Sequence, residues 1–414
     1  MFVGTEFGAY YTTDGGVNWT KLNGLPTIAV YDLDIQKRES DLVAATFGRG
    51  FYVLDNYAPL RNLQAENLAK KAYLFPIKNA KLYNPASSNG LAGTGSQGHN
   101  FWTAANPTFG AVFTLFIKDE FKSLKSIRTE KELKDEKEKK DVFYPSWEEL
   151  RKENMEEPAQ LIWTIKNNEG IEVKRFSSAP SQGVNNVSWN LRMESSSPVN
   201  PNKPKPGRYE SSDDGLMVVA GKYSVEIVLV QNEKTETLVP ATPFEIISLE
   251  GNENKSIASK ELLAFRKEVA ELNRTIAGAG KILQEQQEKL ELMKYAVITY
   301  PNISISMIQD LQTAKLNLDT CRLLIYGDGL KSSKEFETAP TFFNRVNLVY
   351  YELFETSSEI TQTQKEYIKW SQEEYAQFRL KFNSTIVQIK TIEAQLDQAK
   401  IPYLKGKDEK WKKN

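Results

Sequence analysis

The spacing of apolar residues changes near Glu261 in this chain of 414 residues, and the change constrains the fold more than any other feature. Before it, short runs such as residues 170–176 alternate apolar and polar side chains, which is typical of β-strands. After it, apolar residues recur at steps of three and four, which is typical of amphipathic helices. The first such stripe comprises Leu262, Phe265, Val269, Leu272, Ile276, Ala279, Leu283, Leu290, Met293 and Val297. The sequence therefore predicts a multidomain β plus α protein.

Three further apolar stripes follow the first one. They cover residues 308–325, 343–353 and 367–396, and turn or cap residues such as Pro, Gly and Thr separate them. Four amphipathic helices joined by short connections are typical of an antiparallel bundle. We therefore expect a C-terminal helical bundle over 257–400, followed by a basic tail over 401–414.

The first 57 residues contain an internal repeat. Residues 2–14 align without gaps with residues 43–55, at an offset of 41 residues that suits a four-stranded propeller blade. The identical pairs are Thr5/Thr46, Tyr11/Tyr52 and Asp14/Asp55. Each copy predicts a short strand, a glycine-containing turn, an aromatic strand and an Asp-led turn.

Thr12–Trp19 (TTDGGVNW) fits a hairpin-turn pattern called the Asp-box, Ser/Thr-x-Asp-x-Gly-x-(Ser/Thr/Asn)-Trp. We interpret Thr12, Asp14, Gly16 and Trp19 as structural residues of this turn. Asp14 would accept backbone hydrogen bonds, Gly16 would supply a positive φ, and Trp19 would plug the base of the hairpin. A catalytic role for the Asp14 carboxylate is the alternative. We favour the turn because Asp beside Gly-Gly is ordinary turn chemistry.

At these residues the chain resembles the Asp-box, or BNR-repeat, propellers, which include sialidases and the sortilin-type propellers. The resemblance implies that residues 1–57 are the last blades of a partial β-propeller. Isolated blades cannot bury both faces. We therefore expect the remaining blades upstream of Met1 or in another chain.

The middle of the chain contains short strands separated by turns. Residues 58–105 indicate a linker and a loop-rich segment, which holds the single histidine, His99, in a polar context. Residues 106–248 predict a small antiparallel sandwich. A charged insertion, 118–157, interrupts it. Its stretch from Lys118 to Asp141 has 9 basic and 8 acidic residues, so it predicts a solvated helical insertion or a disordered excursion rather than a nucleic-acid site.

Two further stretches extend the resemblance. One set of residues resembles the Ig-like module that follows the propeller in large bacterial BNR-repeat, sortilin-like proteins often labelled as glycosyl hydrolases. It comprises Asn106, Pro107, Gly110, Ala111, Trp189, Leu191, Arg192, Gly221 and Tyr223. Residues 345–353 and 361–364 resemble the helical tail of the same proteins. Such modules also occur in flagellar hook-capping proteins, so their presence implies a fold and not an activity.

Composition excludes several kinds of chemistry. One cysteine and one histidine rule out disulfide frameworks, CxxC redox pairs and multi-histidine metal sites. A formal charge of −1 argues against a nucleic-acid partner, and no run approaches the ~18 apolar residues of a membrane span. Cys321 lies on an apolar stripe and is interpreted as a buried small hydrophobe. We expect no catalytic residue, no cofactor and no metal in this chain.

The sequence thus favours a non-catalytic binding or scaffolding fragment of a BNR-repeat protein, which interacts with protein or glycan. The alternative is a portion of a glycoside hydrolase or sialidase, whose active site would lie mostly in upstream blades, because glycoside cleavage needs two positioned carboxylates. A peptidase would need a G-x-S-x-G elbow, which the sequence lacks. The resemblance implies an extracytoplasmic location, with the signal peptide absent from this chain.

Overall fold

The computed structural model describes residues 1–85, 106–201, 214–232, 234–249, 260–301, 303–356, 358–399 and 401. The chain divides into two compact units. Met1–Pro85, Ser96–Leu191 and Ala220–Gly251 form a unit of strands, and Ala86–Gly95, Arg192–Val219 and Asn252–Asn414 form a unit of helices. The expected β plus α class is confirmed.

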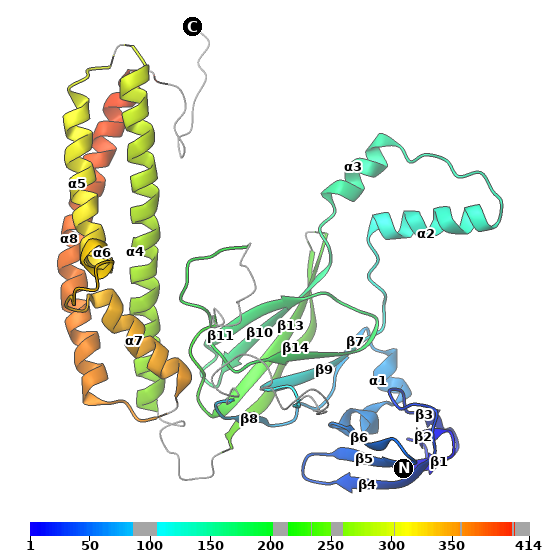
Figure 1. The fold of residues 1–414 in the computed structure, drawn as a ribbon. Helices are drawn as coiled ribbons and strands as arrows, with labels where there is room; N and C mark the ends of the chain where they lie inside the picture. The colour runs from blue at the N-terminus through cyan, green and yellow to red at the C-terminus, as the bar shows by residue number, and fades with distance from the viewer. Residues whose placement is uncertain are drawn as a thin grey trace. The chain divides into compact units, whose positions relative to one another are not determined.

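The N-terminal residues form two small antiparallel sheets (Figure 1). The first contains β1 (Phe2–Thr5), β2 (Gly8–Tyr11) and β3 (Thr20–Lys21), and the second contains β4 (Val30–Gln36), β5 (Asp41–Thr46) and β6 (Gly50–Leu54). They share a core around Ala9, Val30 and Ala44. Gly4 allows their close approach, because a Cβ at this position would lie 2.5 Å from the Val30 carbonyl oxygen.

The internal repeat corresponds to the hairpins β1–β2 and β5–β6. In both, a threonine hydroxyl donates a hydrogen bond across the turn, from Thr5 to the Gly8 carbonyl (2.9 Å) and from Thr46 to the Gly50 carbonyl (2.7 Å). The second turn is one residue longer, so the pairing register places Tyr52 where the first hairpin has Tyr10. The ungapped match of Tyr52 with Tyr11 is therefore wrong by one position after the turn, because sequence alignment without gaps cannot show a turn insertion.

Residues 58–85 have more regular structure than the linker that the sequence indicates. They form η1 (Ala58–Asn62), α1 (Ala65–Ala69), β7 (Ala72–Leu74) and β8 (Ala80–Leu82). β7 pairs with β9 and β8 pairs in parallel with β14, so these short strands belong to the larger sheets. Three-residue strands have too few positions to show an apolar period. His99 lies outside the described residues.

Two larger sheets follow. One has the order β12-β9-β7 and the other β11-β10-β13-β14-β8. The strands are β9 (Ala111–Ile117), β10 (Gln160–Asn167), β11 (Glu172–Ser178), β12 (Gly183–Trp189), β13 (Gly221–Gln231) and β14 (Lys234–Ser248). Aromatic pairs join the two sheets: Phe113 stacks on Trp163 (5.6 Å between ring centroids), and Trp189 meets Phe244 edge to face (6.4 Å). The core therefore lies between the sheets.

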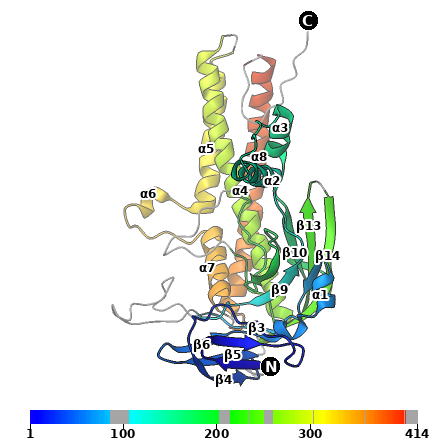
Figure 2. The same cartoon turned by 90° about the vertical axis from the view of Figure 1, so that its right-hand side faces the viewer.

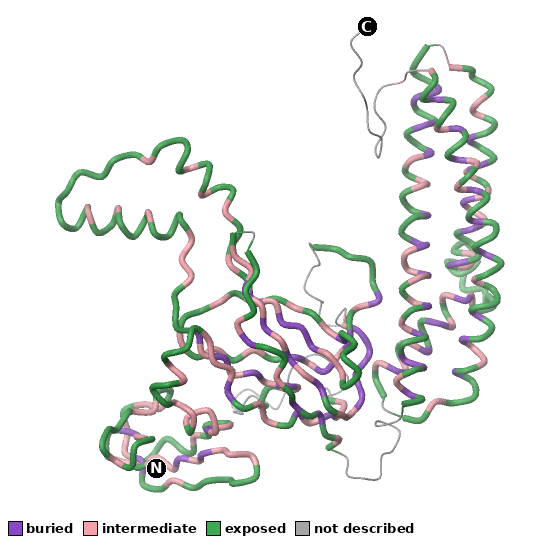
Figure 3. The backbone as a smooth tube through the Cα atoms, turned by 180° about the vertical axis from the view of Figure 1, so that it is seen from behind, coloured by how far each residue is buried: buried purple, intermediate pink, exposed green. Residues whose placement is uncertain are grey.

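The charged insertion between β9 and β10 forms two helices, α2 (Leu124–Lys137) and α3 (Trp147–Met155). None of its residues is buried, as the tube of Figure 3 shows. The helical alternative for this insertion is thus what the structure shows. We call residues 118–157 the arm.

The helical unit contains α4 (Lys260–Thr299), α5 (Met307–Tyr326), α6 (Gly329–Ser332), α7 (Phe342–Glu355) and α8 (Gln362–Gln398). Figures 1 and 2 show α4, α5, α7 and α8 side by side, and each of these helices has buried residues. Capping boxes begin two of them: Thr341 with Asn344 at α7, and Thr361 with Gln364 at α8. The helices begin and end close to the limits of the four apolar stripes.

Candidate functional site

Thr12–Trp19 forms the turn between β2 and β3. The Asp14 carboxylate accepts hydrogen bonds from the Asn18 backbone N–H (3.0 Å), the Asn18 side-chain amide (2.8 Å) and the Thr12 hydroxyl (2.7 Å). The Thr12 hydroxyl also accepts from the Gly16 backbone N–H (3.0 Å), and Gly16 has a φ of +102°. These residues form one hydrogen-bond network that closes the turn.

Trp19 does not plug the base of this hairpin. Its ring lies near the Gly16 backbone and remains 42% exposed. The physical reason is that β3, only two residues long, is the outer strand of its sheet, so no neighbouring described strand covers the indole.

The hydrogen bonds of the turn also fix the charge of Asp14. The Asn18 backbone N–H, followed by the Thr12 hydroxyl and the Asn18 amide, holds the pKa of the Asp14 carboxyl well below its usual value of 3.8. A general acid at neutral pH needs the opposite, a raised pKa. The geometry therefore suits Asp14 to stabilising the turn and not to donating a proton.

A cavity of about 450 Å³ lies beside this turn. It is lined by Met1, Phe2, Tyr11, Thr12, Thr13, Leu33, Ile35, Leu42, Tyr57, Leu60 and Arg61. The Arg61 guanidinium donates a hydrogen bond to the Tyr57 hydroxyl (2.6 Å). None of these lining side chains is a carboxylate, so they cannot supply the acid–base pair of glycoside cleavage.

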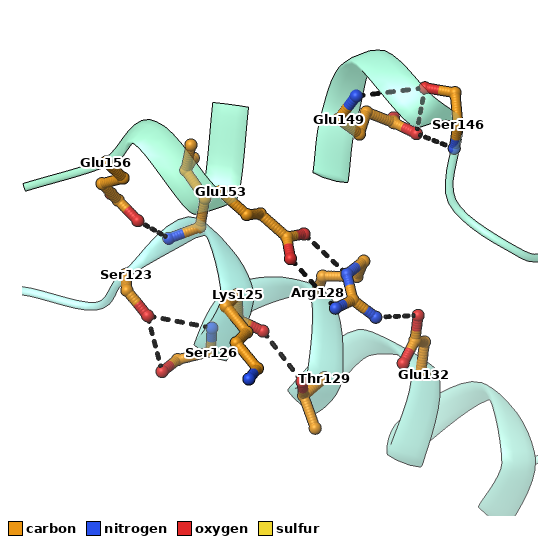
Figure 4. Close-up of polar contacts among 11 residues, drawn as sticks. Ser123, Lys125, Ser126, Arg128, Thr129, Glu132, Ser146, Glu149, Glu153 and Glu156 are labelled. Atoms are coloured by element: carbon orange, nitrogen blue, oxygen red, sulfur yellow. Dashed lines mark hydrogen bonds and ion pairs between the residues drawn. The ribbon is translucent and has the colours of Figure 1, made fainter. Parts of the chain in front are cut away.

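The second candidate site lies on the arm. Ser123 caps α2 by accepting a hydrogen bond from the Ser126 N–H (3.1 Å), and Ser146 and Glu149 form a capping box at α3. Figure 4 shows these caps. Local side-chain bonds therefore define where both helices begin, although neither has a buried residue.

Arg128 of α2 joins the two helices. It donates to Glu153 of α3 through Nε (2.6 Å) and Nη2 (3.0 Å), and to Glu132 through Nη1 (2.7 Å) (Figure 4). The Glu153 pairing, followed by Glu132, raises the pKa of Arg128. The same pairing lowers the pKa of Glu153. This two-pronged ion pair fixes the approach of α2 to α3.

Beside this ion pair the arm has an open groove of about 460 Å³. Its apolar side chains are Leu124, Ile127, Val142, Phe143, Tyr144 and Pro145. Its charged side chains are Arg128, Lys131 and Lys152, against Glu132, Asp135, Asp141, Glu149 and Glu153. We call this surface the arm groove. It combines apolar contact area with an excess of negative charge.

A third unusual feature is a pair of arginines in the helical unit. Arg266 of α4 is buried and donates to the backbone carbonyls of Met217 (2.9 Å) and Thr356 (3.3 Å), while no described group accepts from its Nε. Burial, followed by the charge of Arg192, lowers the pKa of Arg266 from 12.5 to about 10. Arg192 lies 3.6 Å from the centre of the Phe354 ring. These arginines tie the residues around Arg192 and Met217 to the helices.

Sequence reasoning named the Asp14 turn but did not find the arm groove or the buried Arg266. The two serine caps are readable in the arm sequence, since Ser146-x-x-Glu149 is a capping-box pattern. The pairing of Arg128 with Glu153 joins residues 25 positions apart and has no such local pattern. Arg266 sits within the α4 stripe, where an apolar residue is the usual occupant.

Comparison of the chain with protein-family models, with curated proteins and with solved structures finds no match. Across the described ranges, no three His, Cys, Asp or Glu side chains are grouped as metal ligands would be. Nor does any described helix combine the length and apolar character that crossing a membrane requires.

Proposed function

We propose that this chain is a non-catalytic binding and scaffolding protein, and that β1–β6 are blades of an Asp-box propeller like those of bacterial BNR-repeat, sortilin-like proteins. Its partner is a protein or a glycan. The proposal rests on the second N-terminal sheet, β4-β5-β6, whose outer strands have exposed apolar side chains and, in the described part of the chain, unpaired edges.

This sheet has two open edges and exposed apolar side chains. β4 and β6 are its outer strands, and no described strand pairs with their outer edges. Phe51 is 76% exposed, and Tyr31 and Val53 are exposed as well. Unpaired edges attract further strands, and exposed apolar patches mark interaction surfaces. Both features support the proposal that further blades, from the same polypeptide or from another chain, pack here.

The hydrogen bonding of Asp14 supports the non-catalytic part of the proposal. Its carboxylate oxygens are occupied by the turn, and its pKa is lowered. A glycosidase needs two carboxylates, one of which has a raised pKa. The environment of Asp14 meets neither requirement.

We further infer that the two larger sheets correspond to the Ig-like module of the same proteins. The residues that carry this resemblance have packing roles. Trp189 and Tyr223 are buried and meet edge to face at 6.0 Å, and Gly110 lies where a Cβ would be 2.0 Å from the Trp189 carbonyl oxygen. By the same resemblance, we expect the protein to act outside the cytoplasm, in the periplasm, on the cell surface or after secretion.

The test is an assay of the purified chain against aryl glycosides and sialosides. We expect no turnover above background. We also expect Asp14→Asn to lower the melting temperature, because the amide nitrogen cannot accept the hydrogen bonds that the carboxylate accepts. Asp55→Asn, at an aspartate that directly follows β6, is the matched control and should leave the melting temperature unchanged.

Turnover that disappears in Asp14→Asn without a change in melting temperature would contradict the proposal. That result would assign the chain to the glycoside hydrolase or sialidase class instead.

A further inference from the structure

Two helices and the loop between them build the arm groove, and the helices are joined by the Arg128–Glu153 ion pair and by the Leu124 N–H, which donates to the Glu156 carboxylate (2.7 Å). Arg128 and Glu153 hold α2 near α3, and beyond this ion pair the helices leave about 460 Å³ open between them. Cavities of this size hold a drug-sized ligand or a few side chains. Leu124 and Ile127 line the α2 side, so part of the apolar face of α2 has no partner within the arm.

Aromatic side chains lie in the loop that joins α2 to α3 and at the start of α3. Phe143 is 81% exposed and Tyr144 is 94% exposed, and Trp147 follows on the first turn of α3, also exposed. Neighbouring aromatic residues are the side chains that most often supply the binding energy of protein interfaces. Their exposure together, beside an open groove, indicates a docking surface and not single exposed residues.

The charged side chains that line the groove indicate which class of ligand it favours. Five carboxylates against three cations leave the groove with an excess of two negative charges. Arg128, its one arginine, is already paired with Glu132 and Glu153, so it is not available to bind an anion. Such a surface disfavours nucleic acid and anionic lipid, and it favours lysine or arginine on the occupant.

We propose that the arm groove docks a segment of another protein that carries apolar side chains flanked by lysine or arginine. An amphipathic helix with apolar residues at steps of three and four suits the space between α2 and α3, where it would add a third helix. The inference rests on the proposed binding function, and it assigns the partner class and the surface.

Selection from a displayed library of random 16-residue peptides on the full chain tests the proposal. We expect the enriched peptides to be basic and apolar. Their affinity should fall at least tenfold for the Phe143→Ala/Tyr144→Ala double variant and should weaken as salt concentration rises. Phe336→Ala, at an exposed aromatic residue that follows α6, is the matched control and should bind these peptides unchanged. Because all three side chains are exposed, the variants should keep the circular dichroism spectrum of the parent chain.

Enrichment of acidic peptides would overturn the proposal, as would failure to enrich any peptide that depends on Phe143 and Tyr144. Binding of phosphatidylserine vesicles that requires these two residues would assign the surface to membranes and would also overturn it. Peptides whose affinity falls in Phe51→Ala instead would place binding on β4–β6. The proposal for the arm groove would then be wrong, while the proposed binding function would still hold.

Discussion

The helical unit and the N-terminal sheets differ in how they treat their apolar residues. In α4, all ten members of the apolar stripe are buried against the neighbouring helices. In β4 and β6, Tyr31, Phe51 and Val53 are exposed, although these side-chain types are typical of buried strands. The stripe residues of α4 are buried within the chain, whereas these three side chains of β4 and β6 stay exposed in the part of the chain that the structure describes.

This difference indicates that one part of the molecule supplies most of its stability and another part supplies its interaction surfaces. Burial of the helix stripes supplies the helical unit with its own hydrophobic driving force. The core of the N-terminal sheets is centred on small residues, Ala9, Val30 and Ala44, and buries far less apolar surface. We therefore expect stability to be concentrated in the helices, and binding to be concentrated in the sheets and the arm.

The largest expected effect comes from truncating an aromatic residue of the helix core. Phe378 is buried and lies 5.2 Å from Phe382 and 5.7 Å from Phe342, between ring centroids. Phe378→Ala should lower the free energy of unfolding of the helical unit by about 3–5 kcal/mol. Phe51→Ala, the same change on β6, should alter stability by less than about 0.5 kcal/mol. Urea denaturation followed by circular dichroism measures both. Equal losses of stability would show that the exposed Phe51 contributes as much to folding as the buried Phe378.

Arg266→Lys tests whether a buried cation holds the residues around Met217 on the helices. One ammonium group cannot reach both the Met217 and Thr356 carbonyls with the geometry of a guanidinium. We expect a loss of about 2 kcal/mol, since a buried carbonyl is left without its donor. Arg274→Lys, at an exposed ion pair with Glu271, is the matched control and should change little. Unchanged stability of Arg266→Lys would show that the guanidinium of Arg266 does not hold these residues in place.

Two glycine substitutions should shift the two regions in opposite directions. Gly4→Ala forces a Cβ to within 2.5 Å of the Val30 carbonyl oxygen and should destabilise the N-terminal sheets by about 1–2 kcal/mol. Gly278→Ala, inside α4 with open space around it, should stabilise the helical unit by about 0.5–1 kcal/mol. Thermal denaturation of each variant gives the sign. A stabilising Gly4→Ala would mean that the two N-terminal sheets do not approach as described.

The smallest effect concerns acid sensitivity. Hydrogen bonds from Lys78 (2.6 Å) and Lys81 (2.5 Å) lower the pKa of Glu39 from 4.5 to about 2. Because the folded-state pKa is depressed, this contribution is complete above pH 4.5 and is lost as the pH falls toward 2. We expect Glu39→Gln to cost about 1 kcal/mol at pH 7, since the lysines are partly exposed, and clearly less at pH 2, where the carboxylate is half protonated. A cost that does not depend on pH would show that Glu39 acts through packing alone.

The helix stripes were predictable because a period of 3.6 residues repeats over many turns. At the start of α8, however, the side-chain types predict the wrong buried positions. The apolar spacing of the fourth stripe passes through Tyr367 and Trp370, but Ile368 and Ser371 are the buried residues. Gln364 is also buried, because its side chain accepts from the Thr361 N–H and donates to Glu352 (2.7 Å). Polar residues with such partners are invisible to an apolar period.

The turn at Asp14 was predictable for a different reason, since all its hydrogen bonds join residues within four positions. The arm groove depends on how α2 approaches α3, which is decided by contacts between distant residues: Arg128 with Glu153, and the Leu124 N–H with Glu156. The strands β7 and β8 depend on pairing with β9 and β14, far along the chain. Local sequence patterns thus predicted the local features. The features that depend on contacts between distant residues could be seen only in the structure.

Hydrogen–deuterium exchange of the full chain tests the central contrast most directly. We expect slow exchange in the buried turns of α4 and α8, and slow exchange of the β4 and β6 amides that bond to β5. Amides on the outer edges of β4 and β6 should exchange at nearly the rate of an unprotected peptide. Protection of both outer edges equal to that of α4 would show that this sheet is already complete, and it would contradict the proposal that further blades pack there.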